Sequence, residues 1–125
     1  TPKKATAYGF GDRHFVMHIE DGVPVYLERL VQGRINLFKR QFNGKIDGVP
    51  AVETEYYAQD TRAESGDAKL KDINKISTKF YKRDLKEYLK DQPMIWSDMD
   101  KFNFDERKIV NALNEFNAYY TTTAN

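Results

Sequence analysis

The period of the apolar pattern changes partway along the chain, and this change most restricts the possible folds. Up to about Ala58, apolar and polar residues alternate with a period of two, which is typical of half-buried strands. After about Asp84, apolar residues recur every three or four positions, which is typical of core-facing helices. Strands first and helices last, with short connections, predict an α+β fold: an antiparallel β-meander of four to six strands packed by two or three C-terminal helices.

The length of 125 residues fits one domain. We therefore predict a single domain over residues 1–125, strand-rich at 8–73 and helical at 78–120.

The strand-rich part begins with a hairpin. Arg13 to Glu20 alternates, and we expect Phe15, Met17 and Ile19 to share the core face. Asp21-Gly22 predicts the turn. In the return strand, Leu27 and Val31 are expected on one face. Further strands are predicted at Arg34–Arg40, Ala51–Ala58, Tyr8–Phe10 and Ala68–Ile73, with loops at Asn43–Gly48 and Gln59–Asp67.

The helical part carries two capping-box patterns. Asp84 with Glu87 predicts one helix start, and Pro93 its end. Asn103 with Glu106 predicts another, and Met94 to Lys101 is expected to form a short helix between them. The apolar stripe of the last helix is Ile109, Val110, Leu113, Phe116 and Tyr120.

Composition excludes several function classes. Twenty Lys and Arg against 19 Asp and Glu argue against a nucleic-acid binder. No apolar run reaches the roughly 18 residues of a membrane span, so no integral membrane segment is expected. The absence of Cys removes thiolate chemistry. His14 and His18 would lie about 13 Å apart along a strand, too far to share one metal ion. We predict no metal and no cofactor.

The candidate ligand-binding residues are aromatic side chains beside carboxylates: Tyr56, Tyr57, Trp96, Glu53 and Glu55. Glu53 and Glu55 would project from one strand face about 7 Å apart, a separation compatible with paired-carboxylate chemistry. Alternate Glu residues on an exposed sheet face look the same, and the sequence has no nucleophile motif or phosphate-binding glycine loop. No catalytic residues are predicted, and whether the protein is an enzyme stays uncertain, with the balance against it.

A basic stripe is formed by Lys79, Arg83, Lys86 and Lys90, which would share one face of a helix that starts early enough. A solvated helix face is the favoured interpretation. Contact with an anionic membrane surface or an acidic partner is the alternative.

The segment Tyr26-Leu27-Glu28-Arg29-Leu30-Val31-Gln32-Gly33-Arg34-Ile35-Asn36-Leu37-Phe38 resembles the F-L-E-x-L-V-x-G-K-x-x-L-Y strand pair of uncharacterised exported proteins of Bacteroidetes. Thr1 to Gly11, Leu85 to Pro93 and Phe116-Asn117 are similar to further segments of that family, although Phe38 and Phe116 replace its usual Tyr. The resemblance implies a periplasmic or outer-membrane-associated domain, often preceded by more β-structure. It implies no catalytic residues.

The leading functional hypothesis is a non-catalytic interaction or structural domain of an exported cell-envelope protein. The alternative is a small-ligand or glycan-binding protein, or a weak hydrolase, using Tyr and Trp faces beside carboxylates. No signal-like apolar stretch is present, so an export signal is expected to have been removed, or the sequence to begin inside a longer protein. If upstream strands are missing, the segment Thr6 to Phe10 forms a free sheet edge, through which a protein partner or a second copy of the chain could pair.

Overall fold

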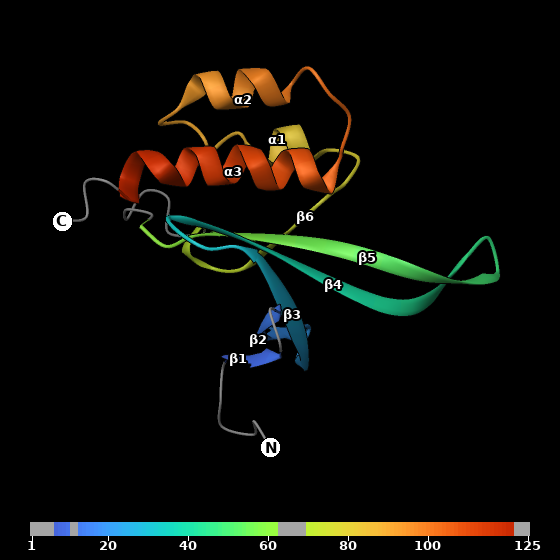
Figure 1. Cartoon of the computed structure of the whole chain (residues 1–125). Coiled ribbons are helices and arrows are strands. Elements are labelled where there is room, and N and C mark those ends of the chain that lie inside the picture. The colour runs from blue at the N-terminus through green and yellow to red at the C-terminus, as the bar shows by residue number, and fades with distance from the viewer. Residues whose placement is uncertain (1–6, 11–12, 63–69, 122–125) are drawn as a thin grey trace.

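The computed structural model describes residues 7–10, 13–62 and 70–121. It confirms the predicted class, because an antiparallel meander is followed by three helices (Figure 1). The strands are β1 (Ala7–Phe10), β2 (Arg13–Glu20), β3 (Val23–Val31), β4 (Ile35–Ile46), β5 (Val49–Asp60) and β6 (Asn74–Ile76), joined in that order in one sheet. The helices are α1 (Tyr81–Leu85), α2 (Pro93–Met99) and α3 (Glu106–Thr121).

The largest differences from the expected strand bounds are in β4 and in the last strand. β4 continues through Asn43-Gly44, where a loop was predicted, and only Asp47-Gly48 forms the turn. Both turn residues have positive φ, 52° and 80°, which matches the right-handed twist of the flanking strands. The last strand is β6 rather than a strand at Ala68–Ile73, of which residues 68 and 69 lie outside the described part, as does most of the predicted loop at Gln59–Asp67.

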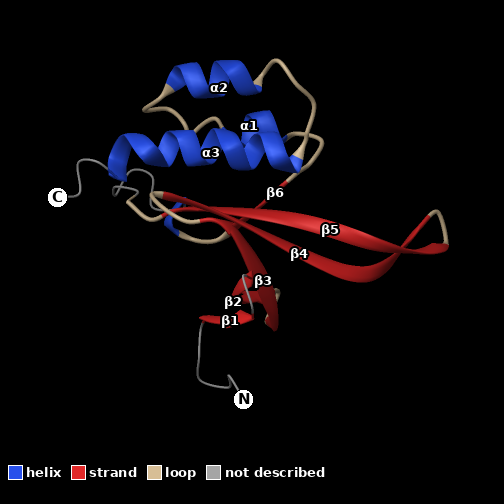
Figure 2. Ribbon diagram, in the orientation of Figure 1, coloured by secondary structure: helices blue, strands red, loops and turns tan. Residues whose placement is uncertain are grey.

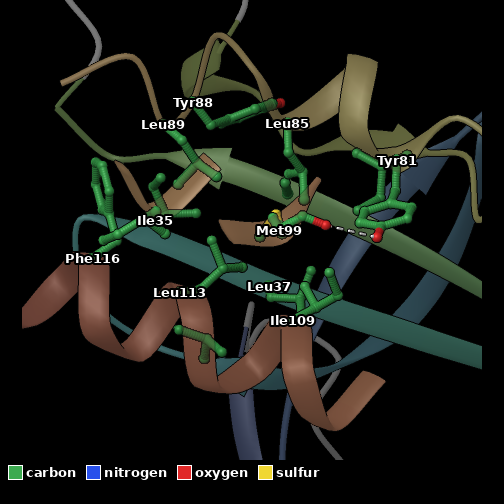
Figure 3. Close-up of a cluster of buried hydrophobic side chains, with 14 of the residues drawn as sticks. Ile35, Leu37, Tyr81, Leu85, Tyr88, Leu89, Met99, Ile109, Leu113 and Phe116 are labelled. Atoms are coloured by element: carbon green, nitrogen blue, oxygen red, sulfur yellow. Dashed lines mark hydrogen bonds between the residues drawn. The ribbon is translucent and has the colours of Figure 1, made fainter. Parts of the chain in front are cut away.

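The helices cover only one part of one sheet face (Figure 2). The core beneath them joins Val31, Ile35 and Leu37 of the sheet to Leu85, Leu89, Ile109, Leu113 and Phe116 of the helical layer. Figure 3 shows the labelled side chains of this core converging from β4, α3 and the segment around α1. Tyr81 ties the layer together, because its hydroxyl donates to the carbonyl oxygens of Met99 and Phe102.

The expected burial of β2 was wrong. Ile19 is 53% exposed, and Phe15 and Met17 are only half-buried. They lie on the sheet face that carries the helices, but β2 lies beyond the reach of α3, which packs on β3 and β4. The opposite residues of the hairpin, Val16 and Val25, instead pack on a second small core of Leu27, Phe38 and Tyr57.

A bulge explains why Leu27 and Val31 do not share a face as predicted. The pairing of β3 with β4 shifts between Arg29 and Val31. An extra residue reverses the alternation, so Leu27 enters the second core and Val31 enters the core under the helices.

Both predicted capping boxes were wrong, although both helical regions exist. Asp84 lies inside α1, and its Oδ2 accepts from the Ser77 N–H at 2.8 Å. The start of α3 is capped by Asp105, whose Oδ1 accepts from the Lys108 N–H at 3.1 Å. Asn103 is two residues too early to reach that N–H, and Glu106 is used elsewhere, as described below.

Among the described residues, no helix combines the length and the apolarity needed to cross a bilayer.

Candidate functional site

The sheet curls strongly, and this brings polar side chains from distant strands together. β2 and β6 are four strand spacings apart, about 19 Å in a flat sheet. Lys75 Nζ of β6 nevertheless lies 3.4 Å from Glu20 Oε2 of β2. Side chains of this length cannot bridge 19 Å, so the sheet must bend into a partial barrel. In Figure 1, β1 to β3 descend from the plane of β4 and β5, away from the helices.

The concave side of this bend carries a cluster of polar side chains from four strands. The Tyr57 hydroxyl lies 2.9 Å from Glu20 Oε2 and 3.2 Å from Glu55 Oε1, so two carboxylates compete for its one proton. Lys75 Nζ lies 2.9 Å from Glu55 Oε2, and Arg40 Nη1 lies 3.4 Å from Glu55 Oε1. The ring of His18 meets the ring of Tyr57 edge-on, at 5.5 Å between centroids.

The protonation states in this cluster follow from its contacts. Burial, and then the hydrogen bond to Glu20, raise the pKa of Tyr57 to about 12. Burial works to raise the pKa of Glu20, but the Tyr57 hydroxyl and Lys75 outweigh it, and the pKa is lowered. The hydrogen bond to Glu55 raises the pKa of Lys75. At neutral pH the cluster therefore holds a protonated phenol, an ionised Glu20 and a charged Lys75.

This arrangement joins strands; it is not poised for acid–base catalysis. A catalytic acid or base works best with a pKa near the operating pH, whereas the pKa shifts here stabilise the resting charge states of Glu20 and Lys75. Two carboxylates face two cations, Lys75 and Arg40, so the charges compensate one another. The cluster connects β2, β4, β5 and β6 on the concave side. Among the described residues, no three His, Asp or Glu side chains converge as metal ligands would.

The five predicted ligand-binding residues do not meet at one place. Tyr57 and Glu55 belong to the concave cluster, and Glu53 lies farther out on the same face, with its carboxylate over Gly44. Tyr56 points to the other face, where its hydroxyl donates to Glu106 Oε1 at 2.8 Å. Trp96 lies in the helical layer, and its indole N–H donates to the Lys82 carbonyl oxygen at 2.9 Å. Ligand binding by these residues stays a prediction.

The surroundings of Tyr56 show how α3 is attached to the sheet. Glu106 Oε1 accepts a hydrogen bond from the Tyr56 hydroxyl and also lies 3.2 Å from Lys39 Nζ. Burial, and then the hydrogen bond to Glu106, raise the pKa of Tyr56. These groups are satisfied by one another, so Tyr56 presents no polar group to a ligand.

Trp96 borders a groove of about 220 Å³ in the helical layer. Its lining residues are Lys86, Glu87, Leu89, Lys90, Pro93 and Trp96. The ammonium group of Lys86 lies 5.3 Å from the Trp96 ring centroid. Trp96 is thus a predicted ligand-binding aromatic that stands beside a hollow.

The outer half of the β4–β5 hairpin is the feature that sequence reasoning missed. β3 pairs with β4 only up to Lys39, and β6 pairs with β5 only from Tyr56 to Ala58. Beyond those points the two strands pair only with each other among the described residues. We call residues 40–55 the β4–β5 arm. It extends past the helical layer in Figure 1, and Ile46, Val49 and Val52 on it are 55%, 63% and 63% exposed.

Comparison with known protein families, with curated proteins and with solved structures finds no match for this chain.

Proposed function

We propose that this protein is a non-catalytic interaction domain of an exported cell-envelope protein, and that the β4–β5 arm binds an extended segment of a partner protein. The single observation that carries the proposal is the arm itself: a two-stranded ribbon with exposed apolar residues and open edges. A two-stranded ribbon alone is marginally stable in water, and open edges accept further strands. The envelope location is supported by the resemblance of the segment from Tyr26 to Phe38.

The geometry of the arm favours the β5 edge as the binding edge. A two-residue turn at Asp47-Gly48 makes Ile46 and Val49 a hydrogen-bonded pair, and the pattern then alternates along the ladder. Val52 and Thr54 therefore direct their main-chain N–H and C=O groups away from β4. The same alternation makes Tyr56 bond toward β6, as its pairing with Ile76 requires.

A partner strand would continue the line of β6. After Ile76 the chain leaves the sheet for α1, so no strand of the described residues lies beside Val52 and Thr54 on the edge away from β4. Main-chain hydrogen bonds would supply affinity, and the exposed Val52 and Val49 side chains would supply apolar contacts. Near the tip, Pro50 on this edge and Lys45 on the other resist unspecific pairing.

The absence of Cys makes a site-specific test possible. Val52→Cys carries one thiol on the arm, and Asn114→Cys carries one on the exposed side of α3 as a matched control. Each variant is labelled with a photoreactive maleimide and illuminated in envelope extract of the source cells. We expect a discrete adduct from Val52→Cys that excess unlabelled protein suppresses. An identical adduct from the control, or none from Val52→Cys, would contradict binding at the arm.

Self-association through the N-terminal edge is the second candidate, and one observation favours it. β1 is an edge strand of the described sheet, paired only with β2. Of the predicted segment Thr6 to Phe10, Thr6 lies outside the described residues. Sedimentation velocity over a range of concentrations tests the proposal, and we expect a dimer that weakens when Thr1 to Ala7 is deleted. A monomer at every concentration would rule it out.

A further inference from the structure

Four cations line the outer face of the segment that begins with α1. Lys79, Arg83, Lys86 and Lys90 are spaced by three or four residues, and the helical winding of α1 continues in turns up to Lys90. The residues that this segment buries are Tyr81, Leu85, Tyr88 and Leu89. With 3.6 residues per turn, the four cations fall on one side of the helical segment and these four buried residues on the other. The cations therefore point away from the core.

Apolar groups are interleaved with these cations. Phe80 is 48% exposed, and its ring centroid lies 4.8 Å from Arg83 Cζ and 5.4 Å from Lys79 Nζ. Trp96 stands beside Lys86, and Met94, at the start of α2, is 76% exposed. We call Lys79, Phe80, Arg83, Lys86, Lys90, Met94 and Trp96 the basic–aromatic face.

The positive charge of this face is only partly compensated. Between Lys79 and Trp96, the span of this face, there are five basic and three acidic residues. Asp84 is engaged by the Ser77 N–H and by Arg83, and Glu87 Oε2 lies 3.9 Å from Lys90 Nζ. Asp91 pairs with Arg34, which is not part of the face, and Lys82 pairs with Asp100. An excess of positive charge therefore surrounds exposed apolar side chains.

We propose that the basic–aromatic face docks on the surface of an anionic lipid bilayer. Lysine and arginine near such a surface are attracted by its negative potential, and interspersed aromatic and Met side chains enter the headgroup region. Trp side chains are enriched in that region, and the N–H of Trp96 keeps its bond to the Lys82 carbonyl oxygen. The groove beside Trp96, of about 220 Å³, is too small to enclose a peptide, whereas docking on a bilayer needs only exposed side chains such as Phe80 and Met94. This proposal is independent of the partner proposed for the β4–β5 arm.

The sole tryptophan reports directly on this docking. Vesicles of phosphatidylcholine alone, and vesicles in which a third of the lipid is phosphatidylglycerol, are titrated into the protein while Trp96 fluorescence is recorded. We expect a blue shift with the anionic vesicles only, quenching by brominated acyl chains, and reversal on raising the ionic strength. An unchanged spectrum with anionic vesicles would overturn the proposal.

Matched charge reversals locate the surface. Lys79→Glu/Lys86→Glu should lower the affinity for anionic vesicles in co-sedimentation by about tenfold or more. Lys45→Glu/Lys71→Glu changes the net charge equally at exposed positions outside the face, and should leave most of the binding intact. Equal losses in both double variants would show binding by net charge alone and would contradict the proposed face. A blue shift with soluble polyglutamate but not with vesicles would assign the face to an acidic polymer and overturn the membrane proposal.

Discussion

The two halves of the β4–β5 hairpin share one continuous ladder but differ in what covers them. The inner half, Ile35–Lys39 with Tyr56–Asp60, lies under α3 and holds buried Ile35, Leu37 and Tyr56. The outer half is the arm, where Ile46, Val49 and Val52 are more than half exposed. The pairing is the same in both halves, so backbone hydrogen bonding sets the length of the strands. The helices decide which residues of one face become core, and the curl of the sheet buries Phe38 and Tyr57 on the other face.

The largest expected effect is at the centre of the covered half. Leu113→Ala removes a side chain that is 0% exposed and faces β4 in Figure 3. A buried leucine truncation costs about 2–5 kcal/mol, and urea unfolding measures it. A loss below about 0.5 kcal/mol, typical of surface positions, would show that α3 contributes little to covering the sheet.

Asn117→Ala tests how α3 is fixed over the start of β4. Its side chain donates to the Ile35 carbonyl oxygen at 2.9 Å and accepts from the Ile35 N–H at 2.8 Å. Removing both bonds leaves the buried N–H and C=O of Ile35 without these partners. We expect the free energy of unfolding, measured in urea, to fall by about 2–3 kcal/mol.

Gly33→Ala probes the same contact from the other side. A Cβ at Gly33 would lie 2.6 Å from Asn117 Nδ2, so the side chain of Asn117 must move. A smaller loss of the same kind is expected, and the double variant should lose less than the sum of the two single variants. Additive losses would mean that the two residues act independently.

Tyr57→Phe sharpens the comparison between the covered face and the concave face. It removes the hydroxyl shared by Glu20 and Glu55 while keeping the ring in the second core. We expect a loss of about 1–2 kcal/mol at neutral pH. Because folding raises the pKa of Tyr57 to about 12, from an ordinary value near 10, this contribution is complete below pH 10 and disappears as the pH rises toward 12.

Alkaline unfolding of the wild type and of Tyr57→Phe checks the sign. The stability difference between them should shrink between about pH 10 and pH 12. If the stability difference stayed constant over this pH range, the protonated hydroxyl of Tyr57 would not be what stabilises the folded state.

The smallest effect is expected in the arm. Val49→Thr and Val52→Thr replace side chains that are 63% exposed, and strands accept Thr well. Each should change the free energy of unfolding by no more than about 0.5 kcal/mol. A loss of 2 kcal/mol or more, as in the covered half, would mean that the arm packs on the rest of the chain in solution, which would remove the basis for a partner there.

Much of the architecture was predictable from local patterns. The alternation in β2 and β5, the Asp47-Gly48 turn and the stripe of Ile109, Leu113 and Phe116 are signals carried by neighbouring residues. The capping predictions failed because the capping position depends on where the chain enters the helix. For α3 this made Asp105, not Asn103, the capping residue.

The candidate sites were less predictable, because they depend on which strands meet. Tyr56 and Tyr57 are adjacent, and the sequence proposed both as ligand contacts. Alternation sends them to opposite faces, where Glu106 engages one and Glu20 the other. No local pattern could pair Tyr57 with Glu20, 37 residues away.

The sequence by itself determined the order of strands and helices, the Asp21-Gly22 and Asp47-Gly48 turns and the apolar stripe of α3, since each depends on residues a few positions apart. Only the tertiary structure decided the rest. The bulge after Arg29 reversed the faces of β3, the curl of the sheet brought Lys75 to Glu20, and the limited reach of α3 left the β4–β5 arm uncovered. These outcomes depend on contacts between segments far apart in the chain, where the pattern within any one segment fits more than one arrangement.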